Sequence, residues 1–512
     1  MSRVAWRVAC GSVGILLIAS SCSLAARFAQ TAGEPPPPPV AATPDAAVSG
    51  GPPDARVEPD TGPPPVPPPR DSGPLPPPTC PSDLAARITV TQIQVDTDIR
   101  YKTPSYDLFP IDERISLSIA GDGSGYVAWT DTDRKVRVTP IGADLKRSAP
   151  DILVDGWDIG GFVALDDGFA VLTRRRDPGE PPLKPETGEV VTAAFLVRYR
   201  AGREVVAVPL TGTMSVTAAT APDARDCVPG FLYGRLAWNG VKLGAYFQVH
   251  GCRGDPHESF YADKLVYTDD RGRYQPGGWG WNCGNNLGLR LLAEPDAFSA
   301  VCLADSRPYP GLNLVTQGVP FRQLSPEFTV AGYVAAQFGS LVKVLADGSY
   351  ALAWLSRGVT TSQGRVAAAK PAWDIELMRL GANYMPLGPK KWLVETPTTA
   401  ETNLHMALYG SDRLLMIWER IDGARCSNDR TCWGPYSGTF ARLMDLNGDP
   451  LSADVPITQI PNGSDDIAVF PDGDLGWAYV VEDARSYQNA LQRDTRLPSK
   501  RTLNVARMRV CE

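Results

Sequence analysis

The chain has 512 residues, with 50 lysines and arginines against 57 aspartates and glutamates, so its formal net charge at pH 7 is −7. This acidic balance argues against a nucleic-acid-binding protein, which would need a basic surface. Beyond the N-terminal residues, no segment is apolar over enough residues to suggest a membrane-spanning helix.

Residues 1–21 have the features of a secretory signal. Two arginines precede an apolar run at residues 13–18, which is too short for a spanning helix. The run ends in Ala19-Ser20-Ser21-Cys22, and small residues directly before a cysteine resemble the lipobox of bacterial lipoproteins. That resemblance implies cleavage before Cys22 and acylation of its thiol, although Ala19 stands where leucine is commoner. The alternative is ordinary signal cleavage in which Cys22 takes no part.

The next segment has the composition of a tether. Residues 22–33 would form the lipidated N-terminus, and residues 34–79 contain repeated proline runs with almost no large apolar residue. Such a stretch cannot build a core and favours extended polyproline structure. We therefore expect an exported protein whose folded domain is held away from a membrane of the cell envelope, either at the outer membrane or at the cell surface.

Residues 80–512 contain a repeated hairpin pattern. In its clearest copy, Asp347-Gly348 separates the apolar runs 341–345 and 350–354. Apolar runs around Asp-Gly or Asn-Gly predict a β-hairpin, because the turn needs positive φ and glycine adopts it freely. A third apolar run follows each hairpin, and a shorter fourth run is common. The turns recur 44 to 73 residues apart, at Asp122, Asp166, Asn239, Asp296, Asp347, Asp412 and Asp472.

Four strands at this spacing are typical of a β-propeller blade. The seven units predict an all-β fold, a single propeller of seven four-stranded blades, with six or eight blades as the alternative. The last unit ends after its third strand, at Val510-Cys511, and an unassigned strand at residues 88–93 precedes the first unit. That strand is similar to the fourth strand of unit six, residues 455–460. We expect it to complete the last blade and close the ring, which would leave no open edge.

Apart from Cys10 and Cys22, the chain has eight cysteines, an even number that favours four disulfides in an exported protein. A metal site is the alternative, but the chain has no CxxC pair and only three scattered histidines. Places in the repeat favour the pairs Cys80–Cys511, Cys227–Cys252, Cys283–Cys302 and Cys426–Cys432.

No cofactor is expected, with one reservation about calcium. Residues 445–449, Asp-Leu-Asn-Gly-Asp, resemble the start of a calcium-binding loop, but Pro450 replaces its glycine and no glutamate follows at the right distance. A structural turn is the preferred interpretation, and calcium remains the alternative.

The chain contains no recognised catalytic motif, and the informative feature is loop length. Connections between second and third strands are long in five units, and all emerge on one face of a propeller: 174–191, 250–263, 357–373, 420–438 and 482–502. Loops on a rigid scaffold usually carry binding residues. Our candidates there and nearby are Arg253, His257, Trp279, Trp281, Arg430, Trp433 and Tyr487. A solvated rim without a ligand is the alternative.

The signal, tether and repeat together resemble exported bacterial lipoproteins with a β-propeller domain. The resemblance implies a location and a fold but brings no ligand. We expect a monomeric, lipid-anchored binding or scaffold protein with a protein or glycan ligand, which would act through the face of the long loops. The alternative is a glycan-active hydrolase or lyase. Two acidic side chains converging on the axis would favour this enzyme, whereas arginine and aromatic side chains there would favour binding.

Overall fold

The computed structural model describes residues 81–100, 114–176, 192–211, 226–228, 232–251, 261–280, 282–283, 288–304, 311–316, 322–327, 336–362, 365–368, 370–426, 432–461, 465–481 and 500–511. Contacts divide the chain into residues 1–76 and 77–512, and every described residue belongs to the second unit. The predicted signal, lipidated N-terminus and tether therefore lie outside the described residues. Within the described ranges, no helix has the length and apolarity needed to cross a membrane.

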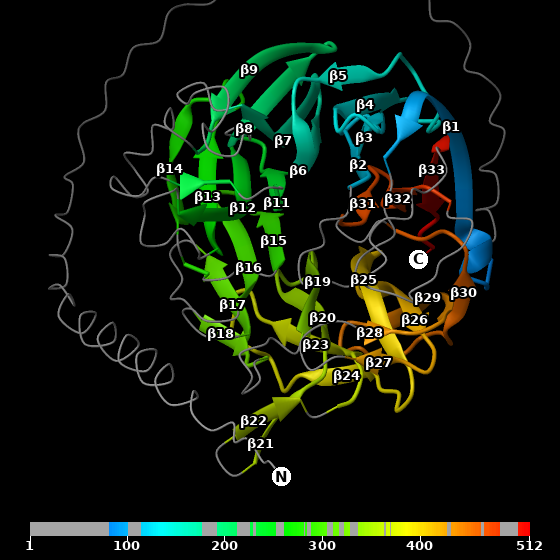
Figure 1. The fold of residues 1–512 in the computed structure, drawn as a ribbon. Helices are drawn as coiled ribbons and strands as arrows, with labels where there is room; N and C mark the ends of the chain where they lie inside the picture. Colours follow the sequence, from blue (N-terminus) through cyan, green and yellow to red (C-terminus); the bar gives the residue numbers. More distant parts are fainter. Residues whose placement is uncertain are drawn as a thin grey trace, which may run out of the picture. The chain divides into compact units, whose positions relative to one another are not determined.

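The second unit is a ring of seven antiparallel β-sheets, which are the blades of a propeller (Figure 1). The predicted seven-bladed all-β fold is thus confirmed. A 3-10 turn, η2 (Ala85–Arg87), precedes the first strand. From the innermost strand outward, blades one and two consist of β2 (Ser116–Ile119), β3 (Gly125–Thr130), β4 (Val136–Ile141) and β5 (Ile152–Val154), then β6 (Trp157–Leu165), β7 (Gly168–Arg176), β8 (Thr192–Arg200) and β9 (Arg203–Pro209).

Blades three and four follow the same order. They consist of β11 (Gly234–Trp238), β12 (Leu243–Gly251), β13 (Tyr261–Thr268) and β14 (Tyr274–Gly280), then β15 (Gly288–Ala293), β16 (Phe298–Ala304), β17 (Gly311–Thr316) and β18 (Arg322–Ser325). A two-residue strand, β10 (Asp226–Cys227), pairs with the end of β12, which also pairs with β11.

Blades five to seven complete the ring. They consist of β19 (Ala336–Lys343), β20 (Tyr350–Ser356), β23 (Asp374–Leu380) and β24 (Lys391–Val394), then β25 (Ala400–Tyr409), β26 (Arg413–Ile421), β29 (Tyr436–Asp445) and β30 (Val455–Ile457), and finally β31 (Ala468–Val469), β32 (Leu475–Tyr479), β33 (Lys500–Met508) and β1 (Ile88–Ile99).

The N-terminal strand closes the ring, as predicted. β1 pairs antiparallel with β33 from Ile88 opposite Met508 to Gln94 opposite Thr502, so the first strand in the sequence is the outermost strand of blade seven. This pairing covers the edge that β33 would otherwise expose.

The core lies between the blades. All seven residues of β20 are buried, because its two faces contact different neighbours. Leu352 and Trp354 pack toward blade four, whereas Ala351 and Ala353 pack toward blade six. This is the period of two expected of a strand, with both faces covered. Seven hydrophobic clusters of this kind join each blade to the next.

The tight turns have the predicted chemistry. Gly123, Gly240, Gly348 and Gly473 all have positive φ, between 68° and 92°. In the clearest copy, the Asp347 carboxylate accepts a hydrogen bond of 2.9 Å from the backbone N–H of Ser349, which fixes the turn.

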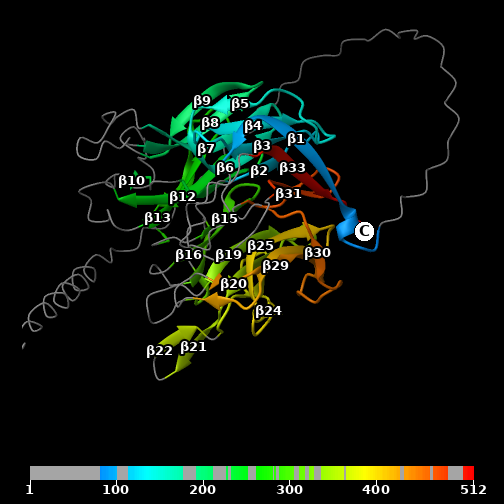
Figure 2. The same cartoon turned by 45° about the vertical axis from the view of Figure 1, so that its right-hand side comes forward.

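Two of the long connections between second and third strands form hairpins of their own. β21 (Val359–Ser362) pairs with β22 (Arg365–Ala368) and projects from blade five (Figure 2), and β27 (Arg425–Cys426) pairs with β28 (Cys432–Trp433) in blade six. In an antiparallel blade, these connections emerge on the face where the inner strand begins. We call this face, which carries the hairpins β21–β22 and β27–β28, the loop face.

Candidate functional site

Three buried arginines occupy the starts of inner strands from different blades. Arg114 precedes β2, Arg235 is the second residue of β11, and Arg290 is the third residue of β15. Their exposed fractions are only 3% to 5%. Because inner strands begin at the loop face, the three side chains lie near the propeller axis toward that face.

Backbone carbonyl groups hold the three guanidinium groups in place. Arg114 donates hydrogen bonds of 2.9 Å to the carbonyl of Gly160 and 3.0 Å to that of Gly234. Arg235 and Arg290 each donate one bond of 2.8 Å, to the carbonyls of Gly234 and Leu289. Burial, and then the charge of Arg235, lowers the pKa of Arg114 to about 10, so the Arg114 guanidinium stays charged at neutral pH.

Two neighbouring aspartates from the start of blade seven, Asp465 and Asp466, face these arginines. They differ in how firmly their carboxylates are held and in their exposure to solvent. Asp465 is fixed, because its carboxylate accepts hydrogen bonds from the Ser116 hydroxyl at 2.7 Å and the Leu117 backbone N–H at 3.1 Å. Asp466 has its carboxylate oxygens 3.3 Å from Nε of Arg290 and 3.6 Å from Nε of Arg235. The Asp466 side chain is nevertheless 47% exposed, so solvent reaches this point of the axis.

Electrostatic effects at this cluster are strong. The surrounding protein partly desolvates the Asp466 carboxylate, which acts to raise its pKa, but the charges of Arg290 and Arg235 outweigh this effect and lower the pKa, so Asp466 stays ionised. Burial also acts to raise the pKa of Tyr233, and the three arginines again reverse the direction. The Arg235 guanidinium lies 5.5 Å from the centre of the Tyr233 ring. Burial, and then the charge of Arg290, lowers the pKa of His405 to about 3, so this imidazole is neutral.

The cluster has more positive than negative charge. Three arginines face two aspartates, which leaves one positive charge in excess among the described residues of the cluster. Nη2 of Arg235 is buried and has no hydrogen-bond partner in the described part of the chain. A buried charge is costly unless it is paired, so this arrangement is suited to an anionic group. We call Arg114, Tyr233, Arg235, Arg290 and Asp466 the axial arginine site.

Of the seven predicted binding residues, the structure describes only Trp279 and the backbone of Trp433. Trp279 lies in β14, where its ring packs edge-on against Tyr246 at 6.0 Å and its Nε1 donates to Asp263 at 3.4 Å, so it contributes to packing within the blade. The backbone of Trp433 lies in β28 on the loop face. The other five predicted residues lie outside the described residues: Arg253, His257, Trp281, Arg430 and Tyr487.

The cysteines that the structure describes occur as disulfides. Cys283 is bonded to Cys302 and Cys426 to Cys432. Cys227 and Cys511 are also disulfide-bonded. Their predicted partners Cys252 and Cys80, and the predicted lipidation site Cys22, lie outside the described residues.

In the described part of the chain, two groups of residues could be considered for a metal ion, and both are already engaged in other bonds. The Asp263 carboxylate lies near Cys283 and Cys302, but it accepts hydrogen bonds from Tyr246 and the backbone N–H of Cys283, and the two sulfurs are bonded to each other. Asp445 accepts the N–H groups of Asn447 and Asp449 at 2.9 and 2.8 Å, as a structural turn requires. Calcium binding at residues 445–449 gains no support from this geometry.

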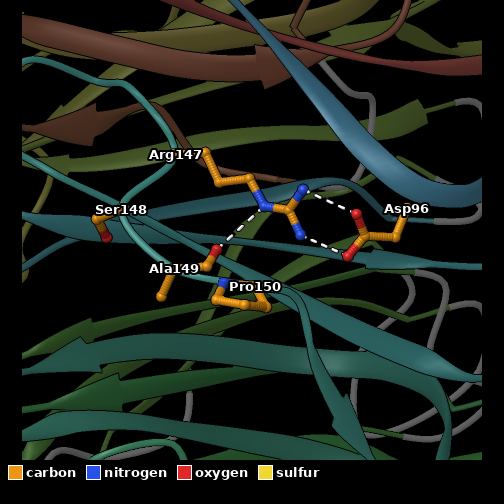
Figure 3. Close-up of a pocket in the computed structure, with 5 residues that line it drawn as sticks. All are labelled: Asp96, Arg147, Ser148, Ala149 and Pro150. Atoms are coloured by element: carbon orange, nitrogen blue, oxygen red, sulfur yellow. Dashed lines mark hydrogen bonds and ion pairs between the residues drawn. The ribbon is translucent and has the colours of Figure 1, made fainter.

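A shallow surface pocket lies between β1 and the segment that leads to β5 (Figure 3). Its dominant feature is Arg147, which donates two hydrogen bonds to Asp96, at 2.9 and 2.5 Å, and a third to the carbonyl of Ala149 at 3.0 Å. These bonds use most of the donors of the guanidinium group. The pocket therefore ties the closing strand to blade one and offers little to a ligand.

Sequence reasoning missed the arginine cluster. A weak signal was present, because Arg235 and Arg290 interrupt apolar inner strands, where a charged side chain is unusual. The pattern could not show that these residues converge, since each lies in a different repeat.

Comparison with known proteins identifies no family and gives only distant structural similarities. No protein-family model and no curated protein matches the chain. A solved structure of a protein of unknown function from Dyadobacter fermentans is 11% identical, with a TM-score of 0.38, and the match covers 70% of this chain and 99% of that one. The GH93 α-L-arabinofuranosidase of Fusarium graminearum is 8% identical, with a TM-score of 0.33, and the match covers 77% and 92%.

A subtype N11 neuraminidase-like protein of A/flat-faced bat/Peru/033/2010 is also similar. It is 9% identical, with a TM-score of 0.33, and the match covers 71% of this chain and 97% of that one. Likeness at these levels supports no argument about function, and the fold assignment rests on the strand order of this chain.

Proposed function

We propose that this protein binds a carboxylate-bearing ligand at the axial arginine site, which the ligand reaches from the loop face. The observation that carries the proposal is the convergence of Arg114, Arg235 and Arg290, all buried and all held by backbone carbonyls. Guanidinium groups match the planar geometry of a carboxylate, and fixed donors lose little entropy on binding. Asp466, itself a carboxylate, already lies between two of them.

Binding is better supported than glycan hydrolysis. Hydrolysis at the axis would need two carboxyl groups that both face the substrate. Both oxygens of Asp465 are already engaged by blade one, and Asp466 faces arginines rather than a second acid. Arginine and tyrosine side chains dominate the site, as expected of a binding surface.

We also propose that the chain is exported and lipid-anchored at the cell envelope, on the strength of the signal-like N-terminus, Cys22 and the proline-rich tether. Detergent partitioning of the protein from its native host tests this location. A native protein found wholly in the aqueous phase would contradict the anchor.

Calorimetric titration with D-glucuronate, and with uncharged D-glucose for comparison, tests the proposed ligand class. We expect glucuronate to bind and glucose not to bind. Arg235→Met should weaken glucuronate binding roughly tenfold to a hundredfold, since a hydrogen bond to a charged group contributes about 1.5–3 kcal/mol.

Arg198→Met is the matched control. Arg198 is also buried, at 2% exposure, but it pairs with Asp167 in blade two, away from the axis. This variant should lose stability without losing affinity. Folded wild-type protein that binds glucuronate no better than glucose would contradict the proposed function.

A further inference from the structure

We infer that Asp466 is an internal competitor: in the ligand-free protein its carboxylate takes the place of the ligand's carboxylate, and binding requires it to move out. This inference rests on the proposed function and adds a regulatory element to the same site. Its basis is a difference in mobility between the arginines and the acid that faces them.

The arginines are fixed, and Asp466 is not. Arg235 and Arg290 have side chains that are 6% and 4% exposed, and each is tied to a backbone carbonyl at 2.8 Å. Asp466 is 47% exposed, and no hydrogen bond to its carboxylate is found among the described residues. Rotation of one short side chain toward solvent would therefore free both Nε groups without disturbing the core.

The ion pairs of Asp466 are also long. Its oxygens lie 3.3 and 3.6 Å from the two Nε atoms. Most of the other arginine–carboxylate pairs among the described residues are shorter, such as Arg137–Asp131 at 2.7 Å and Arg420–Glu401 at 3.1 Å, whereas Arg379–Asp347 is as long, at 3.7 Å. Asp466 thus balances the charge of the arginines without forming the close hydrogen bonds that a free carboxylate could form.

The neighbouring residue, Asp465, fixes the backbone about which the Asp466 side chain would rotate. Asp465 is held by the Ser116 hydroxyl and the Leu117 backbone N–H, so the chain next to Asp466 is anchored to blade one. Exchange of the Asp466 carboxylate for a ligand carboxylate would leave the charge beside the arginines unchanged. Both carboxylates cannot occupy the site together, because like charges at this distance repel.

Competition of this kind lowers the apparent affinity of the protein for its ligand. When the open site is present in only a fraction of molecules, the apparent affinity falls by that fraction. We therefore expect Asp466→Asn to bind D-glucuronate on the order of tenfold more tightly than the wild type, by calorimetric titration under identical buffer conditions. Asp472→Asn is the matched control, since Asp472 is an exposed blade-seven aspartate paired with Arg507 away from the axis, and its affinity should not change.

The outcomes separate the two proposals. If the wild type binds glucuronate and Asp466→Asn binds it equally or less tightly, Asp466 is not a competitor, although the binding site stands. If neither protein binds glucuronate, the proposed function itself is wrong. If Asp466→Asn does not fold, the variant Asp466→Glu tests the inference. Its longer side chain keeps the negative charge and can approach the arginines more closely, so glucuronate affinity should fall. Unchanged or tighter glucuronate binding by Asp466→Glu would overturn the inference.

Discussion

At the residue scale, two buried glutamates and a lysine form a second charged cluster, in which the protonation of Glu376 depends on pH. Glu376 and Glu327 are both buried, and both approach Nζ of Lys390, at 2.8 and 3.4 Å. Two carboxylates share one lysine, so the pair has one negative charge in excess. Burial, and then the charge of Glu327, raises the pKa of Glu376 to about 7.

The raised pKa of Glu376 predicts that this residue destabilises the fold as the pH rises. Between pH 4.5 and about 7, the folded protein binds a proton at Glu376 that the unfolded chain releases. Its contribution to stability is complete below pH 4.5 and is lost as the pH rises through about 7. Glu376→Gln should therefore reduce the loss of unfolding free energy between pH 5 and pH 7.5 by about 1–3 kcal/mol.

Urea denaturation at the two pH values measures this difference. The pKa of Glu401 is also raised to about 7 by burial, so part of the pH dependence of the unfolding free energy should remain in the Glu376→Gln variant. Glu395→Gln is the control, because this side chain is 65% exposed and pairs with Lys370 at the surface, so the wild-type slope should remain. An unchanged slope in Glu376→Gln would mean that Glu376 is already ionised in the folded protein.

At the scale of single strands, contact between neighbouring inner strands positions the axial arginine site. A Cβ atom at Gly161, in β6, would lie 2.5 Å from the backbone nitrogen of Leu236 and 2.7 Å from the carbonyl carbon of Arg235. The two strands therefore approach backbone to backbone, in the manner that only glycine allows. The position of Arg235 depends on this close contact between blades two and three.

Gly161→Ala should consequently affect both stability and binding. The new methyl group meets backbone atoms, which cannot rotate away, so we expect a loss of about 1–3 kcal/mol in the unfolding free energy. Glucuronate affinity should fall as well, because β11 must shift together with Arg235. Chemical denaturation and calorimetric titration measure the two effects.

Gly388→Ala provides the comparison for Gly161→Ala. A Cβ atom at Gly388 would meet no atom within 4 Å, so this variant should match the wild type in both measurements. Full affinity in a destabilised Gly161→Ala protein would show that the contact between β6 and β11 does not set the position of Arg235.

At the scale of the whole molecule, the ring depends on a strand from the far end of the sequence. β1 supplies Ile93 and Val95 to the cluster between blades seven and one, where they meet Leu503 and Val505 of β33. Outside this cluster, Arg147 of blade one adds the ion pair with Asp96 of β1. Ring closure thus depends both on the hydrophobic core between blades seven and one and on the pairing of β1 with β33.

Ile93→Ala should weaken closure much more than Val90→Ala on the same strand. Ile93 is 2% exposed, and loss of a buried isoleucine costs about 2–5 kcal/mol. Val90 is 38% exposed, and its truncation should change stability by no more than about 0.5 kcal/mol. Chemical denaturation of the two variants measures the difference, and equal stabilities would show that blade seven holds without β1.

The sequence by itself determined the architecture of the domain, because its signals are local. Asp-Gly turns need positive φ, as Gly123 and Gly348 show, and blade strands need apolar runs such as Tyr350–Ser356. The orphan strand at residues 88–93 pointed to ring closure, since an incomplete last blade needs a fourth strand. Tryptophans near the ends of second strands, Trp129, Trp354 and Trp418, continue these apolar runs, and all three are fully buried.

Only the tertiary structure decided which side chains meet at the axis. Arg114, Arg235, Arg290 and Asp466 belong to four different blades, and nothing in the sequence around one of them points to the other three. Their convergence depends on the register of each inner strand and on the contact between neighbouring blades, which no local pattern encodes. The packing of Trp279 against Tyr246 was likewise decided by the tertiary structure, because an aromatic residue near a loop and one in a blade core have the same local sequence.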